Sequence, residues 1–489
     1  MNKKKQKKEL HPSNIAGIRA AMLVARPMLL ALTVSCVFAV AEAQAPVGHD
    51  ARLPRLLHAS MSDPAMTGTA AGMAQQDQAK YLGPGSCAAT ACHGGVMARD
   101  TTKVLQNEYS TWIVQDRHSR AYTVLNQPLG QRMAAILKIG DPTKAQKCLV
   151  CHALAPPPAL MGREFDISEG VSCESCHGPS SLWLGPHVQA SARHADMVRL
   201  GLVDNKNLEA RSERCLTCHL GTENAQVDHE MLAAGHPDLT FELDSFDSIE
   251  PPHWVEKAPD QKQPIADPLY GVRIWSVGQV VSLRESMVRL ARNASGPVWP
   301  EYTEMDCFTC HHSLTKPMDS WRQAEGYPDR RPGNPPYNAA RYVVFRHFAR
   351  AIDPAGTEQL EKNMAQVYAL VSELQPDRSK LAAEARSTAE TAQSLTAKVE
   401  NATYDRARTA SLMRDISADA DAISLQGERS AEQALMALDS LYIASTQQAQ
   451  PNPAVRSAID GMYKLLDNPS AYSAPVFAAQ MKKVRAALE

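Results

Sequence analysis

Ten of the eleven cysteines in this 489-residue chain occur in pairs, and a histidine directly follows the second cysteine of every pair. Four pairs have the spacing C-x-x-C-H, and the fifth has four residues between its cysteines. The five groups are Cys87/Cys92/His93, Cys148/Cys151/His152, Cys173/Cys176/His177, Cys215/Cys218/His219 and Cys307/Cys310/His311. This spacing is typical of c-type haem attachment, because two thiols on a short turn can bond to the porphyrin while the next imidazole binds its iron. The sequence therefore predicts five covalently bound haem c groups.

Zinc sites and disulfide bonds are the alternative interpretations of these cysteines. Zinc sites also use C-x-x-C pairs, but they do not need a histidine after each second cysteine. Disulfides are common in exported chains and explain the cysteines, but not the histidines. Histidine makes up only 16 of 489 residues, so its recurrence after every pair favours haem. For Cys87 and Cys92, whose loop is longer, a plain disulfide remains open.

The second axial position of each haem iron decides between two kinds of chemistry. A second histidine closes the iron and suits electron transfer, whereas an open position lets a substrate bind. The predicted second ligands are His118, His187, His229, His236 and His312. We expect His229 and His236 to share one helical face and to serve two different haems. We expect His312, which follows a motif histidine, to reach a neighbouring haem.

Three further histidines are weaker candidates for axial ligands. His194 lies in a charged run, His253 in a proline-rich loop, and His347 among aromatic and arginine residues. For every one of the eight candidates, an ordinary surface or core histidine remains the alternative.

The N-terminus has the pattern of an export signal. A basic run at residues 1–10 precedes an apolar stretch at residues 28–40, which is too short to span a membrane comfortably. Small residues favour cleavage after Ala43; an uncleaved anchor and a lipoprotein-type site at Cys36 are the alternatives. No later apolar run is long enough to cross a bilayer. The mature chain is therefore expected to be periplasmic or otherwise exported, without a stable membrane span.

The charge balance argues against nucleic acid as a partner. The first 43 residues carry seven basic and two acidic residues, so the remainder has 44 basic and 51 acidic residues and a net charge of −7. A mildly acidic chain of this kind is unlikely to bind a polyanion non-specifically.

Composition and apolar spacing predict a mainly α fold with long loops. We expect a signal peptide at residues 1–43, a flexible linker at 44–79, a pentahaem cytochrome c domain at 80–350, and a haem-free helical bundle or hairpin at 351–489. Tyr109 and Trp112 predict a helix before His118, and apolar residues from Ile274 to Val288 predict another that ends near Gly296.

The C-terminal part has heptad-like apolar stripes at residues 360–374 and 381–399. A third long helix is expected over residues 412–442, and a shorter one after Pro453. These helices could support a homodimer or dock a partner; the alternative is a cap over the haem domain.

Four segments between residues 80 and 190 resemble the multihaem cytochrome c-554 family. They are YLGPGSCAATACHGG, WIVQDRHSRAY, CLVCH and GVSCESCHGPSSLWLGPH, in the order of the family. HEMLAAGHPDLTFEL and WPEYTEMDCFTCHHSL are similar to segments of larger exported multihaem cytochromes. The resemblance implies a largely helical, exported electron carrier with closely stacked haems, most of them ligated by two histidines, and one haem that can be five-coordinate. This chain differs from the family by its fifth motif, the long first motif and the helical tail.

Two functions are therefore compatible with the sequence. The first is electron transfer between redox partner proteins, whose identity the sequence does not give; it needs no catalytic residue. The alternative is an oxidoreductase that acts on a small nitrogen or sulfur compound at one five-coordinate haem. Such a site needs donors near the ligand, and the candidates, which otherwise pair with propionates or aid solubility, are Arg117, Arg120, Tyr122, Arg273 and Arg284. We expect the non-enzymatic function.

Overall fold

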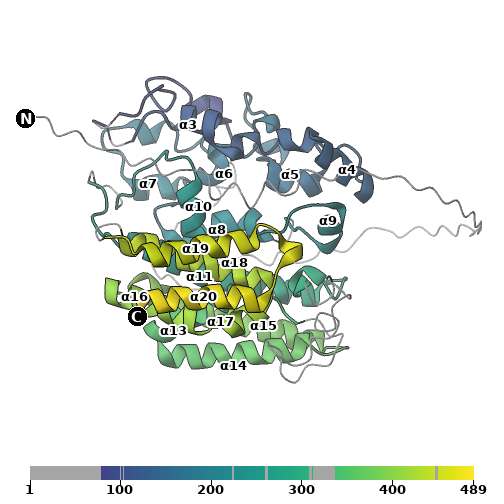
Figure 1. The fold of residues 1–489 in the computed structure, drawn as a ribbon. Coiled ribbons are helices and arrows are strands. Elements are labelled where there is room, and N and C mark those ends of the chain that lie inside the picture. Colours follow the sequence, from purple (N-terminus) through teal and green to yellow (C-terminus); the bar gives the residue numbers. More distant parts are fainter. Residues whose placement is uncertain are drawn as a thin grey trace, which may run out of the picture. The chain divides into compact units, whose positions relative to one another are not determined.

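Helices and long loops make up the part of the chain that the structure describes (Figure 1). The computed structural model describes residues 79–489 except positions 100, 103, 223–224, 259–260, 262, 308–310, 312–335 and 447–449. Within these residues there is no strand, only two isolated bridges, Tyr81 to Met161 and Met305 to Tyr337. The predicted mainly α fold is thus confirmed. The predicted signal peptide and all of the predicted linker except Ala79 lie outside the described residues.

Short helices carry the attachment motifs. α5 (Gln146–His152) ends at a motif histidine, and α6 (Cys173–His177) is itself one motif. α8 (Leu208–Leu216) continues into a π-helical turn, Thr217–Gly221, that contains Cys218 and His219. A single turn of helix therefore presents both thiols and the imidazole, as the attachment chemistry requires.

Further short helices lie between the motifs. The predicted helix before His118 is α3 (Glu108–Gln115), which is followed by a 3-10 turn, Arg117–Arg120. The others are α4 (Pro128–Leu137), α7 (His194–Arg199), α9 (His229–Ala234) and α10 (Leu243–Ile249).

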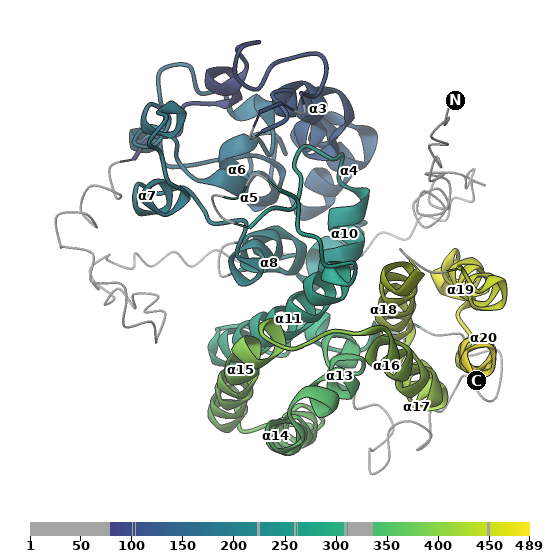
Figure 2. The ribbon, with the colours of Figure 1, turned by 90° about the vertical axis from the view of Figure 1, so that its left-hand side faces the viewer.

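α11 (Tyr270–Ser295) is the longest helix and lies between the motif-bearing helices and the C-terminal ones (Figure 2). It packs against α8 on one side and along α15 (Arg378–Glu400) on the other. Most of its residues are buried, Trp275 and Leu283 completely. The helix predicted from Ile274 to Val288 is confirmed, with its end at Ser295 before Gly296.

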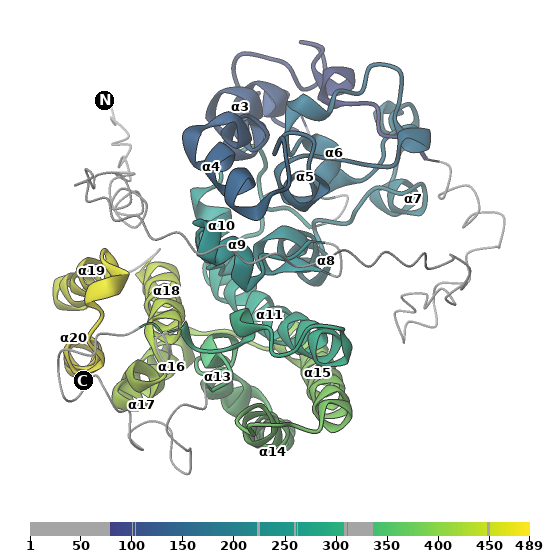
Figure 3. The same ribbon diagram turned by 90° about the vertical axis from the view of Figure 1, so that its right-hand side faces the viewer.

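The C-terminal residues form more helices than the apolar pattern predicted. α18, α19 and α20 lie side by side, next to α16 and α17 (Figure 3). The helices are α13 (Phe345–Ile352), α14 (Pro354–Val371), α15, α16 (Arg406–Ala418), α17 (Ala420–Leu425), α18 (Glu428–Thr446), α19 (Pro453–Leu466) and α20 (Ala474–Leu488).

Three expectations for this part were wrong. The third long helix is divided into α16, α17 and α18, because the chain leaves helical geometry at Asp419 and takes a left-handed φ of 98° at Gly427. A Cβ at Gly427 would lie 2.5 Å from a carboxylate oxygen of Asp306, so only glycine fits this turn. The short helix after Pro453 is in fact two helices. Leu374, expected in an apolar stripe, lies beyond α14 and is 85% exposed.

The apolar side-chain core lies mainly around α11 and the C-terminal helices. One continuous cluster runs from Leu208 to Val484, whereas a second, small cluster holds only Leu125, Leu149 and Ala153. Among the described residues, no helix combines the length and apolar character that crossing a membrane requires. The predicted domain boundary near residue 350 stays a prediction.

Candidate haem-binding site

Four of the five motif histidines face a histidine from elsewhere in the chain. The ring centroids are 6.2 to 6.3 Å apart in all four pairs, while the angle between the rings ranges from 13° to 88°. The pairs are His93 with His187, His219 with His118, His152 with His236, and His311 with His229. Every histidine–histidine ring pair among the described residues joins one motif histidine to one non-motif histidine.

The constant spacing fits a metal ion between the two rings. Direct packing of aromatic rings couples their distance to their relative orientation, yet here the distance stays the same as the angle changes. Two imidazoles that bind one ion from opposite sides, with metal–nitrogen bonds of about 2 Å, have their ring centres about 6 Å apart at any angle around the axis. The four pairs therefore fit the axial ligands of haem irons.

Hydrogen bonds at the outer ring nitrogen orient most of these imidazoles. Nδ1 of His93 lies 2.9 Å from Oε2 of Glu108, and Nδ1 of His118 lies 3.0 Å from Oδ1 of Asp116. Backbone carbonyl oxygens play the same role for three others: His152 with Ala121, His187 with Leu184, and His236 with Pro237. Such bonds fix the tautomer and leave Nε2 for the metal.

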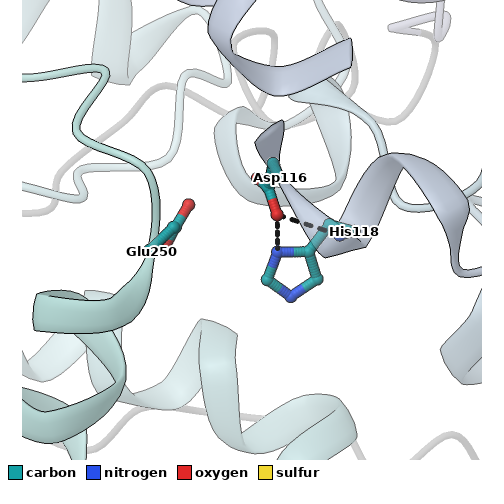
Figure 4. A group of neighbouring side chains, drawn as sticks. All are labelled: Asp116, His118 and Glu250. Carbon is teal, nitrogen blue, oxygen red and sulfur yellow. Dashed lines mark hydrogen bonds and ion pairs between the residues drawn. The ribbon is translucent and has the colours of Figure 1, made fainter. Parts of the chain in front are cut away.

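Asp116 and His118 also form a tight acidic group with Glu250 (Figure 4). The backbone N–H of His118 donates to the same Asp116 oxygen that faces its ring, at 2.9 Å. Burial raises the pKa of Glu250 to about 7. Because His118 also faces His219, we interpret Asp116 as the group that orients this imidazole rather than as a metal ligand.

Three of the predicted second ligands need comment. His312 and Cys310 lie outside the described residues. His229 and His236 were expected on one helical face, which was wrong, because α9 ends at Ala234 and Gly235 takes a left-handed φ of 112°. They nevertheless face the histidines of two different motifs, as expected.

His194 and His347 have their Nε2 atoms engaged by carboxylates. Nε2 of His194 lies 2.7 Å from Oδ1 of Asp204, and Nε2 of His347 lies 3.0 Å from Oδ2 of Asp419. Both imidazoles are therefore turned away from metal binding in this structure.

None of the nine described motif cysteines forms a disulfide, Cys87 and Cys92 included. Two thiols from different motifs lie next to each other in two places. A hydrogen bond from Cys173 lowers the pKa of Cys87 to about 7, and one from Cys218 lowers the pKa of Cys151. The first motif therefore adjoins the third, and the second adjoins the fourth.

His177 differs from the other motif histidines. It takes part in none of the ring pairs among the described residues. Burial, together with the nearby imidazoles of His253 and His93, lowers its pKa to about 4.

Two of the arginines proposed for a distal pocket have contacts within the helical core. Arg284 binds Glu209, Glu213 and Glu285, and so links α11 to α8. Arg273 donates to the backbone oxygen of Glu400 and lies 4.9 Å from the ring centre of Tyr404. These contacts stabilise helix packing.

Nε of Arg214 is buried without a hydrogen-bond partner. Its positive charge acts to lower the pKa of both the Cys176 and the Cys218 thiol. A guanidinium between two attachment motifs suits the carboxylate of a haem propionate, which would supply the missing acceptor.

The comparison with known families agrees with this geometry. Residues 86–178 match the family model of cytochrome c554 and c-prime. The matched segment contains the first three motifs and His118, which confirms the resemblance drawn from the sequence. It supports a c-type cytochrome with covalently bound haem c and a role in electron transfer. No curated protein and no solved structure matches the chain.

Sequence reasoning missed the groups that orient the ligands. Glu108 and Asp116 stand 15 residues after His93 and two residues before His118. An aspartate just before a candidate ligand histidine is a usable signal. The contact between Glu108 and His93 depends on the fold.

Proposed function

We propose that the chain is an exported pentahaem cytochrome c that passes electrons between redox partner proteins. Each of the five motifs holds one haem c through its two thiols and its histidine. The observation that carries this proposal is the set of four imidazole pairs with one common spacing. Haem iron with two histidine ligands changes its oxidation state without binding a substrate, which is the chemistry that the cofactor supplies here.

The contacts between motifs support a continuous series of haem sites. The thiols of Cys87 and Cys173 join the first and third motifs, and those of Cys151 and Cys218 join the second and fourth. The backbone N–H of Val171, just before the third motif, donates at 3.2 Å to the carbonyl oxygen of His118, which faces the fourth motif. The third and fourth motifs are therefore neighbours as well.

α9 connects the fifth motif to this series. His229, its first residue, faces His311 of the fifth motif, and His236, just beyond its end, faces His152 of the second. Asp228, which caps α9, also pairs with Lys147 of the second motif. The order that follows along the series is first, third, fourth, second and fifth.

Export and the nature of the partners are further parts of the proposal. The N-terminal signal pattern supports export, where c-type haem is attached. Both partners are proposed to be redox proteins rather than nucleic acid. A homodimer through the C-terminal helices stays a prediction; Leu360, Leu381 and Leu395 of the heptad-like stripes are buried within the chain.

Spectroelectrochemical titration tests the proposal. We expect the purified protein to take up and release five electrons per chain reversibly, and its oxidised spectrum to stay unchanged when nitrite or hydroxylamine is added. Turnover of either compound, or uptake of fewer than five electrons, would contradict it.

One observation favours the second candidate function, an oxidoreductase for a small nitrogen or sulfur compound. Among the described residues, His177 has no imidazole at the spacing of the other pairs, so its iron is the one that could be five-coordinate. A high-spin haem whose spectrum shifts with added nitrite, together with turnover, would support this candidate.

A further inference from the structure

His253 has the hydrogen-bonding pattern of the second ligands. Its Nδ1 lies 3.2 Å from the backbone oxygen of Pro251 and 3.8 Å from Oε1 of Glu250. His187 and His236 likewise bond through Nδ1 to a backbone oxygen within three residues. In all three the outer nitrogen is held by the local backbone, which leaves Nε2 for a metal.

The surroundings of His253 place it beside the third motif. Nδ1 of His253 lies 3.8 Å from Oε1 of Glu250, whose carboxylate lies within 4.8 Å of ligand atoms of Asp116 and His118. The carbonyl oxygen of His118 accepts from the backbone N–H of Val171, just before the third motif. The imidazole of His253 contributes to the lowered pKa of His177. It also interacts electrostatically with Asp116 and Glu108. Asp116 orients the second ligand of the fourth motif, and Glu108 orients the histidine of the first. The third motif lies between these two in the series of haem sites, and His177 is its histidine.

The loop that carries His253 is tied to α8 through residues that follow His253. The ring of His253 packs against Trp254 at 4.7 Å, and Nε1 of Trp254 donates to Oε1 of Glu256 at 2.9 Å. Glu256 in turn accepts from Arg211 of α8 at 2.7 Å. α8 leads directly into the fourth motif, so the loop is tied to the haem-bearing helices while no helix includes His253 itself.

The other histidines that the structure describes are not available as a second ligand opposite His177. His118, His187, His229 and His236 already face other motifs, and His194 and His347 have Nε2 engaged by carboxylates. His312, outside the described residues, follows the histidine of the fifth motif directly. Among the candidate histidines that the structure describes, His253 is the one whose Nε2 has neither a carboxylate nor a motif imidazole opposite it.

We propose that His253 is the second axial ligand of the haem held by Cys173, Cys176 and His177, and closes it to substrates. This inference rests on the proposed pentahaem cytochrome. Its ring is not at the 6.2 to 6.3 Å spacing from His177, so the proposal includes a local shift of His253 toward the iron, within the loop that Glu256 ties to α8. All described haem sites are then ligated by two histidines.

Electron paramagnetic resonance of the oxidised full-length holoprotein tests this assignment. We expect wild type to be wholly low-spin and His253→Ala to convert one haem in five to high spin. Free imidazole should restore the low-spin signal, because it can occupy the vacated position. His253→Met should stay low-spin but raise the potential of one haem, since methionine ligation raises haem potentials.

His194→Ala is the matched control, because His194 is also a half-buried non-motif histidine but has its Nε2 on Asp204. It should leave the spin state unchanged. A spectrum of His253→Ala identical to wild type, or a high-spin haem already present in wild type, would overturn the role of His253. If His253→Ala does not fold, an unchanged set of potentials in His253→Met would overturn it. Haem content is read separately by pyridine haemochrome, and a wild-type value other than five per chain would instead contradict the proposed function.

Discussion

Residues 79–207 and residues 270–489 are folded by different means. The first region buries few apolar side chains: Ala79, Trp112, Leu125, Ala134, Leu149, Ala153, Trp183 and Met197. The second region belongs to one continuous apolar core that includes α11 and all helices after it. The first region holds three of the five attachment motifs in short helices and coil. We infer that covalently bound porphyrins there replace the side chains that form a core elsewhere.

The partners of buried or half-buried carboxylates also differ between the two regions. In the second region, Glu304 is completely buried and accepts from Nε of Arg289 at 2.8 Å and from Nδ2 of Asn293 at 2.8 Å. In the first region, the half-buried Glu108 and the buried Asp116 are directed at motif or ligand histidines. The ion pair of Glu304 thus holds helices together, whereas Glu108 and Asp116 orient ligand imidazoles.

The largest expected effect is the loss of folded structure in residues 79–207 when haem attachment is prevented in the whole chain. Without haem, residues 79–207 have too little apolar surface to offset the entropy of an ordered chain. We expect limited proteolysis of the haem-free chain to digest this region, while a fragment with α11 to α20 persists. Equal protease resistance of the two regions would contradict the contrast between them.

The next effect concerns the buried ion pair of the second region. Glu304→Gln leaves the buried guanidinium of Arg289 without its counter-ion, and breaking such a pair costs about 3–5 kcal/mol in the free energy of unfolding. Chemical denaturation followed by circular dichroism measures it. Glu358→Gln is the control: its partner Lys362 is 65% exposed, and exposed pairs contribute about 0–1 kcal/mol.

Leu290→Ala should have a somewhat smaller effect on the same measurement. Leu290 is fully buried in α11, and a leucine truncated in a core costs about 2–5 kcal/mol. Val288→Ala, on the same helix but 42% exposed, should change the free energy of unfolding little. The visible haem spectrum should be unchanged in both variants. A loss of haem absorbance in Leu290→Ala would mean that the two regions depend on one core.

The smallest expected effect is a pH dependence of the stability of the second region. Burial, together with the nearby carboxylates of Glu432 and Asp238, raises the pKa of Glu428 to about 8. The folded state therefore keeps this proton where the unfolded state has lost it, so this contribution to stability declines as pH rises from about 4.5 to about 8. Glu428→Gln should reduce the fall in melting temperature between pH 5 and pH 8. An equal fall in wild type and variant would contradict this assignment.

Local patterns predicted the elements that depend on neighbouring residues. The spacing of cysteine and histidine identified the motifs, and apolar periodicity located α3, α11, α14 and α15. The same periodicity failed where single residues interrupt a helix, at Asp419 and Gly427, because an apolar stripe does not register a change of backbone conformation. Gly235 separated His229 from His236 in the same way.

The pairing of histidines could not be predicted, because it depends on contacts between distant segments. His93 and His187 are 94 positions apart, and the sequence between them contains two further motifs. The spacing supplied a set of candidate ligands, and only the fold places each opposite a particular motif. That no described imidazole forms a ring pair with His177 is likewise a property of the three-dimensional arrangement.

The number of covalently attached haems per chain tests the central claim most directly. Intact-protein mass together with the pyridine haemochrome assay should give five haem c groups in wild type and four in the variant Cys87→Ser/Cys92→Ser. Fewer than five in wild type, no loss in the variant, or zinc in place of iron would contradict the account.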